Sequence, residues 1–233
     1  MSSRVNDAPL VQGEIKDGAG WNPRNHDGRF QGPMLLGDAL IRSRNLPWIR
    51  VGNDSRDRLN AVLQSVHLGP LETGKPSQFI GTIGTTTLQL AAAYSIFSQH
   101  GMYKPTRIVK RAKFDGDEYD SPVIEPTRVV SSSTADQVAT VLRQVITEPQ
   151  GTGHGLAKYP GIRGSIKTGT NGSTDLRTVY FDERRVIAIW VGRRSNKPLW
   201  AGASSASILP FTAEVIQVTN ARTLELVSRK RKE

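Results

Sequence analysis

Apolar positions in the first two thirds of the chain recur at helical spacing, which predicts a mainly helical beginning. The first helix is expected to begin at Pro33, because proline suits a first turn, and to end just before Ser43. A second helix is expected to start at Leu46, and Ser55 is a candidate N-cap for a third. Ser43 and Asn45 therefore lie on a short connection between two predicted helices.

Further helices and one hairpin-like segment are predicted along the rest of the chain. Residues 89–97 form the most hydrophobic helical stretch, which is expected to be central. Ser133 followed by Asp136 resembles a capping box and predicts the start of another helix. Residues 103–124 carry basic and then acidic side chains, which indicates a hairpin or an excursion from the body. An Ala/Ser-rich helix from about Ser204 is expected to close the fold.

Two β-type runs, residues 164–170 and 186–192, lie late in the chain and are predicted to be neighbouring strands. The second run is almost wholly apolar. In the first run, Gly169 leaves one strand edge open to another backbone or a ligand. With helices first and antiparallel strands late, the sequence predicts an α+β fold.

Composition divides the chain into an irregular lead-in, a main unit and a basic tail, with expected ranges of 1–32, 33–220 and 221–233. The lead-in is rich in residues that favour turns. An irregular start of this length is unusual in a compact domain, so it is expected to pack on something or to be the edge of a larger unit.

The net charge of +10, with a pI near 10.1, would suit nucleic acid, an acidic polymer or an anionic membrane surface. Outside the tail the basic residues are scattered, so nucleic-acid binding is the least favoured of the functions considered. The chain has no cysteine and four widely spaced histidines, which predicts neither a metal site nor a cofactor. No apolar run approaches the roughly 20 residues of a membrane span, and no signal peptide is visible.

Two polar clusters carry the candidate chemistry, Ser43-Arg44-Asn45 and Lys167-Thr168-Gly169-Thr170. A Ser-x-Asn and a Lys-Thr-Gly motif together resemble two of the three signatures of the penicillin-recognising acyl-serine enzymes. Five further segments resemble the transpeptidase domain of class A penicillin-binding proteins, and residues 191–193 with Gly202 resemble the 1C branch. These segments are residues 21–33, 38–47, 88–94, 151–153 and 175–192.

This resemblance implies a fold like that of penicillin-binding proteins and serine β-lactamases, with an antiparallel sheet and a helical subdomain. It implies a peptidoglycan D,D-transpeptidase, which acylates a serine with a D-Ala-D-Ala stem peptide and binds β-lactams at the same place. Ser43 and Lys167 would sit on opposite sides of the cleft and help to shuttle a proton to the leaving amine. Asn45 would hydrogen-bond the substrate amide.

The strand residues would hold the substrate. Thr168 and Thr170 are expected to bind its carboxylate beside the open edge at Gly169. The backbone near Thr170 would donate an N–H to an oxyanion hole. The resemblance also implies a location on the extracytoplasmic, periplasmic face of the inner membrane.

One departure from the family pattern changes the expected activity. The family's nucleophile is the first serine of a Ser-x-x-Lys motif upstream of Ser-x-Asn, and no serine of this chain has lysine three positions later. The fold is therefore expected to be incomplete at its N-terminus. The first hypothesis is part of a transpeptidase, inactive alone, that needs a Ser-x-x-Lys from upstream, on a partner polypeptide or on a homologue. The alternative is a non-catalytic peptidoglycan-binding pseudoenzyme.

Overall fold

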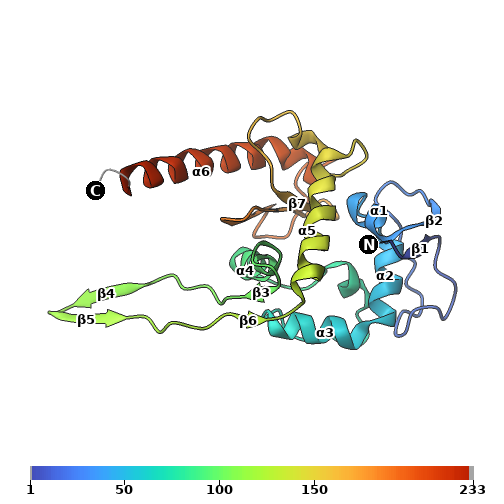
Figure 1. Ribbon diagram of the computed structural model, residues 1–233. Coiled ribbons are helices and arrows are strands. Elements are labelled where there is room, and N and C mark those ends of the chain that lie inside the picture. Colours follow the sequence, from blue (N-terminus) through green and yellow to red (C-terminus); the bar gives the residue numbers. More distant parts are fainter. Residues whose placement is uncertain (1, 231–233) are drawn as a thin grey trace.

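The structure, a computed structural model, describes the backbone of residues 2–230 and the side chains of residues 2–220. Helices and a three-stranded antiparallel sheet make an α+β fold, as predicted (Figure 1). The basic side chains predicted for the tail lie outside the described side chains. The boundaries of the lead-in and the main unit stay predictions.

The lead-in contains a strand, so the prediction that it is irregular was wrong at that point. Strand β1 (Arg4–Asp7) pairs antiparallel with β2 (Gly32–Leu35), and Asn6 lies opposite Pro33. The first helix, α1 (Leu36–Ile41), therefore begins three residues after the predicted Pro33. The φ of proline is compatible with an extended strand as well as a helical turn, and the long-range pairing with β1 selects the strand.

Two further helices follow α1 after tight connections. Helix α2 (Asn45–Asp54) carries Pro47 in its first turn, and α3 (Arg56–Ser65) begins directly after Ser55. Ser55 is the N-cap residue, but its side chain makes no capping hydrogen bond. A short 3₁₀ helix, η1 (Pro76–Ile80), packs against α2.

The hydrophobic helix α4 (Thr87–Ser98) starts with a complete capping box between Thr86 and Gln89. Only Ala93 and Ile96 of this helix are fully buried, so it is less central than its composition predicted. The next long helix, α5 (Ser132–Thr147), is capped by Ser131, which accepts from the backbone N–H of Thr134. The predicted cap at Ser133 was therefore two residues late, because a run of three serines offers several candidates.

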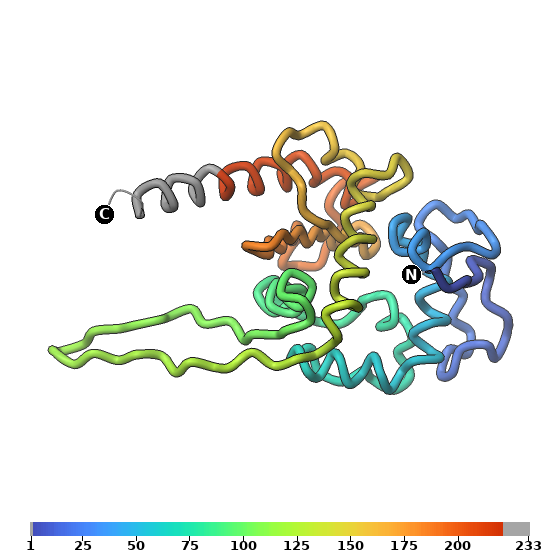
Figure 2. The backbone as a smooth tube through the Cα atoms, in the orientation of Figure 1, coloured from blue at the N-terminus to red at the C-terminus, as the bar shows by residue number. Residues whose placement is uncertain are grey.

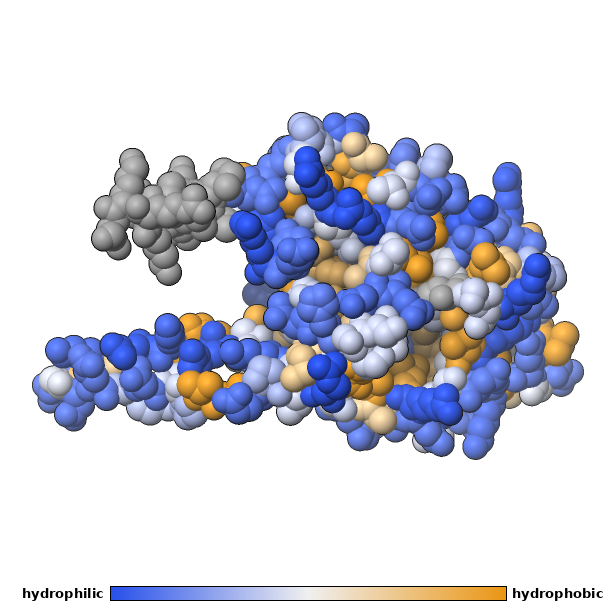
Figure 3. Space-filling view, in the orientation of Figure 1, coloured by the Kyte–Doolittle hydropathy of each residue, from blue (hydrophilic) through white to orange (hydrophobic). Residues whose placement is uncertain are grey.

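Residues 103–124 form the predicted excursion, a long hairpin arm that projects from the body (Figures 1 and 2). Its strands are β4 (Arg111–Phe114) and β5 (Asp117–Asp120), and every residue in them is exposed. The short pair β3 (Met102–Tyr103) and β6 (Thr127–Arg128) anchors its base. Its surface is mainly hydrophilic with a few hydrophobic patches (Figure 3), and Phe114 is 84% exposed.

The main sheet has the order β7-β8-β9, with β7 (Ser165–Asn171), β8 (Asp175–Phe181) and β9 (Val186–Gly192). The prediction that the first and last of these strands are neighbours was wrong, because β8 lies between them. The resemblance of residues 175–192 to the family's strand pair pointed to this extra strand, but the hydrophobic pattern did not. The turn before β8 is short: it begins at Asn171-Gly172, and Gly172 has a φ of 55°.

Helices cover both faces of the sheet. On one face Phe181 packs against Tyr94 and Phe97 of α4. On the other, Thr178 hydrogen-bonds Thr212 of α6 (Leu209–Lys230), which follows the 3₁₀ helix η3 (Ser205–Ile208). Residues 204–208 are thus a cap and a 3₁₀ turn, and the predicted α-helix starts at Leu209. Because paired residues point to one side, Lys167, which lies opposite Val179, shares the face of α4.

Candidate functional site

The structure brings the two polar clusters together. Nζ of Lys167 on β7 lies 2.7 Å from Oγ of Ser43, although the residues are 124 positions apart. The same Nζ donates to the carbonyl oxygen of Thr168 at 2.6 Å. Burial lowers the pKa of the Lys167 ammonium to about 8 from its ordinary value of 10.5. An amine with this pKa can both give and take a proton near neutral pH.

Ser43 occupies the turn between α1 and α2 with a left-handed backbone. Its φ is 52°, in a region that non-glycine residues adopt at a cost of about 1 kcal/mol or more. The turn is closed on the α1 side, where the N–H of Ser43 donates to the carbonyl of Leu40 and that of Arg44 donates to Ala39. The left-handed residue reverses the chain, and its hydroxyl meets Lys167.

Arg44, the middle residue of Ser-x-Asn, is buried and clamped by the lead-in. Its Nε donates to Asp7 at 2.8 Å, and its Nη1 donates to Asp27 at the same distance. A third contact reaches the carbonyl of Arg29. Asp7 is fully buried and also accepts from Asn25 at 2.7 Å. The lead-in therefore holds Arg44 of the Ser-x-Asn motif in place. The sequence did not predict these contacts. The available signal was the resemblance of residues 21–33 to a family segment.

Asn45 is held at the first turn of α2 by the same lead-in. Its backbone N–H donates to the side-chain oxygen of Asn25 at 2.7 Å, and its Nδ2 donates to the carbonyl of Arg24 at 2.8 Å. Its side-chain oxygen accepts no hydrogen bond from any described residue, so it is free to receive one from a ligand. The predicted role of Asn45 toward a substrate amide stays a prediction.

The glycine-rich turn at residues 151–153 connects α1 to strand β7. The N–H of Thr152 donates to the carbonyl of Ile41, and its hydroxyl lies 2.5 Å from that of Thr168. A Cβ at Gly151 would lie 2.3 Å from the carbonyl oxygen of Val145, so this approach requires glycine. Thr168 is buried with its hydroxyl so engaged, and its predicted contact with a substrate carboxylate stays a prediction.

Gly169 and Thr170 lie further along β7, which is an edge strand of the sheet. Gly169 is exposed, and a Cβ there would meet only the Cβ of Arg177, at 3.8 Å. The hydroxyl of Thr170 accepts from the N–H of Ser205 at 2.9 Å. The open strand edge beside Gly169 agrees with the sequence reading, while the substrate contacts of both residues stay predictions.

Within residues 2–220, no group of three or more His, Asp or Glu side chains could hold a metal ion. The contacts described above bring together a serine hydroxyl, a lysine amine, an amide and an open strand edge. This set can transfer protons and bind a polar backbone.

A family model described as the penicillin binding protein transpeptidase domain matches residues 2–205. Penicillin-binding protein 1B of Vibrio cholerae is 29% identical over 88% of this chain and 27% of that protein. Penicillin-binding protein 1C of Escherichia coli is 28% identical over 95% of this chain and 28% of that protein. The chain thus spans between a quarter and a third of these curated relatives.

Solved structures agree on the fold. Penicillin-binding protein 1A from Haemophilus influenzae superposes with a TM-score of 0.76 at 22% identity, covering 93% of this chain and 39% of that one. PonA1 from Mycobacterium tuberculosis in complex with penicillin V has a TM-score of 0.67 at 20% identity, covering 89% and 60%. With the family match over most of its length, the chain belongs to the penicillin-binding protein transpeptidase family.

Proposed function

We propose that this chain supplies the Ser-x-Asn and Lys-Thr-Gly motifs of a peptidoglycan D,D-transpeptidase site. The observation that carries this proposal is the 2.7 Å contact between Lys167 Nζ and Ser43 Oγ. Its ligand is a stem peptide that ends in D-Ala-D-Ala, and a β-lactam occupies the same place. By the same family membership, the working location is the periplasmic, extracytoplasmic face of the inner membrane. The described helices include none long and apolar enough to cross a membrane.

The Ser43–Lys167 pair works as a proton relay. Because Ser43 Oγ accepts from Lys167, its own O–H is free to donate toward the leaving amine of the substrate. Lys167 then returns a proton to Ser43, which its lowered pKa makes easy near neutral pH. Asn45 orients the peptide amide, and the edge of β7 at Gly169 and Thr170 receives its backbone.

The relay does not include the serine that would accept the acyl group. No serine of the 233 residues begins a Ser-x-x-Lys motif, so we propose that this chain alone does not form an acyl-enzyme. A fluorescent penicillin should leave no covalent label on the purified chain. A stable adduct on Ser43 would refute this part of the proposal.

The second candidate is a non-catalytic peptidoglycan-binding module. The absence of a Ser-x-x-Lys motif supports this module as well as it supports a transpeptidase that is inactive alone. The two are separated by supplying a family segment that carries Ser-x-x-Lys as a second polypeptide. Covalent labelling of that segment, lost when Lys167→Ala is used, supports the transpeptidase. D-Ala-D-Ala peptide binding without labelling under any complementation supports the module.

A further inference from the structure

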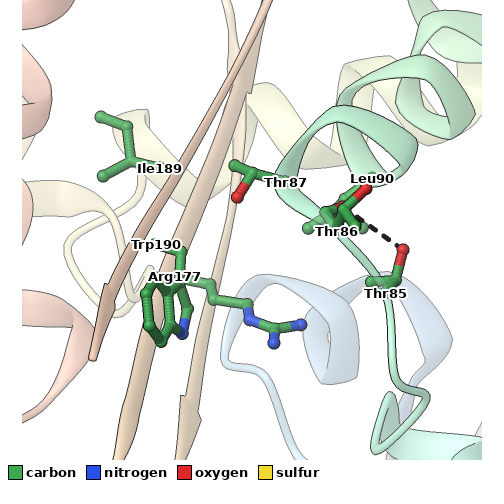
Figure 4. Close-up of a pocket in the computed structure, with 7 residues that line it drawn as sticks. All are labelled: Thr85, Thr86, Thr87, Leu90, Arg177, Ile189 and Trp190. Carbon is green, nitrogen blue, oxygen red and sulfur yellow. Dashed lines mark hydrogen bonds between the residues drawn. The ribbon is translucent and has the colours of Figure 1, made fainter. Parts of the chain in front are cut away.

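A small pocket lies between the first turn of α4 and the sheet, on the sheet face that carries Lys167 (Figure 4). Its volume is about 300 Å³. Hydroxyls line one wall, a guanidinium and an indole line the opposite wall, and the side chain of Leu90 lies on the helix side. The side chain of Ile189 points to the other face of the sheet. The lining residues are Thr85, Thr86, Thr87, Leu90, Arg177, Ile189 and Trp190.

The guanidinium of Arg177 is the pocket's unused donor. It makes no hydrogen bond with any residue in the described part of the chain, and its nearest carboxylate is Asp175, at 4.0 Å. Asp175 is already engaged, because it accepts from the indole N–H of Trp190 at 2.7 Å. The Arg177 side chain is only 31% exposed, so its charge has lost part of its water, and in the described part of the chain it has gained only this long ion pair with Asp175.

We propose that this pocket is a subsite for a carboxylate of the peptide ligand, with Arg177 as its anchor. Arginine presents parallel N–H groups that match a carboxylate, and the hydroxyl of Thr87, which has no partner in residues 2–220, can add a donor. The residual charge of Asp175 disfavours a dianionic phosphate. Leu90 suits a short aliphatic stem.

The subsite rests on the proposed function for its ligand, and its position fits that ligand. Arg177 lies opposite Gly169, and Lys167 lies opposite Val179. Arg177 and Lys167 are therefore diagonal neighbours on one sheet face, roughly 7–8 Å apart between Cα atoms. One extended peptide can place its reacting end at Lys167 and a side-chain carboxylate at Arg177.

The test compares acetyl-Glu-D-Ala-D-Ala with acetyl-Gln-D-Ala-D-Ala, which differ by one carboxylate, in calorimetric titrations of the full chain. We expect the Glu peptide to bind about tenfold more tightly, the scale of one charge-assisted hydrogen bond. Arg177→Gln should abolish this preference. Arg163→Gln, which removes the same charge from an exposed residue outside the pocket, should retain it. Equal binding of the two peptides to the unaltered chain, or a preference that survives Arg177→Gln, would overturn the proposal.

A second arm keeps the subsite testable if no D-Ala-D-Ala peptide binds. Acetate is titrated at constant ionic strength while the indole N–H signal of Trp190, assigned from Trp190→Phe, is followed by NMR. A saturable shift that Arg177→Gln removes supports the subsite even where the proposed function fails. A Trp190 signal that acetate leaves unmoved rejects the subsite whatever the peptides do.

Discussion

The carboxylate of Asp7 and the guanidinium of Arg44 form an ion pair of 2.8 Å with almost no access to water. Their side chains are 0% and 6% exposed, respectively. The pair joins β1 to the residue between Ser43 and Asn45. Because Arg44 is also bound by Asp27 and by the carbonyl of Arg29, the turn that presents Ser43 is fixed by chain far upstream.

Arg44→Met should destabilise the fold by about 3–5 kcal/mol, the cost of leaving a buried charge unpaired. Urea unfolding measures the loss. Arg50→Met is the matched control, because Arg50 pairs the lead-in with α2 through Glu14, where the side chains are 17% and 26% exposed. That variant should lose less, and only Arg44→Met should shift the amide signals of Ser43 and Asn45. Equal effects of the two variants would contradict a specific role for Arg44.

Because burial lowers the pKa of the Lys167 ammonium, the free energy of unfolding should rise with pH. The pKa of its ammonium is about 8 in the folded chain and 10.5 ordinarily, so the unfolded state binds more protons between these values. Folding stability contributed by this group should therefore rise with pH through that window. The free energy of unfolding, relative to Lys167→Met, should gain roughly 3 kcal/mol between pH 7 and pH 11. Lys158→Met, at an exposed lysine, should show no comparable gain, and a flat Lys167 difference would refute the burial of the amine.

Local patterns in the sequence were enough to predict the helices, the excursion and the residues of two strands. Helical periodicity and caps are properties of neighbouring residues, so α4 and α5 could be found with errors of a few residues. The strand at Gly32–Leu35 could not, because its pairing with Arg4–Asp7 overrides the helical preference of Pro33. The order β7-β8-β9 likewise depends on a tight turn that the hydrophobic pattern does not reveal.

The site shows the same division between local and distant information. The family resemblance implied that Ser43 and Lys167 lie on opposite sides of one cleft. The structure places their side chains in contact, and their role in proton transfer stays a prediction. The partners of Arg44 lie 15 to 37 residues away, and nothing in the local pattern marks Asp7 as buried. Only tertiary structure distinguishes such a carboxylate from an ordinary surface residue.

In the glycine-rich turn at residues 151–153, ahead of β7, replacing a glycine by alanine should lower the stability of the fold. Gly153→Ala would place a Cβ 2.7 Å from Cγ2 of Ile166, and Gly151→Ala would place one 2.3 Å from the carbonyl of Val145. Each should lower the free energy of unfolding by about 1–3 kcal/mol or more, because the core must shift. Gly169→Ala, whose Cβ meets nothing closer than 3.8 Å, should stay within about 0.5 kcal/mol. A Gly169→Ala as costly as the other two would show that the strand edge is occupied.

The left-handed backbone at Ser43 separates the conformational role of this residue from its chemical role. Ser43→Gly and Ser43→Ala both remove the hydroxyl that accepts from Lys167, but only glycine adopts a φ of 52° without strain. Ser43→Gly should therefore be more stable than Ser43→Ala by about 1 kcal/mol in urea unfolding. Both should abolish Lys167-dependent labelling of a supplied Ser-x-x-Lys segment to the same extent, because both lack the relay hydroxyl. Labelling that survives in the glycine variant would mean that Ser43 serves the turn and carries no proton.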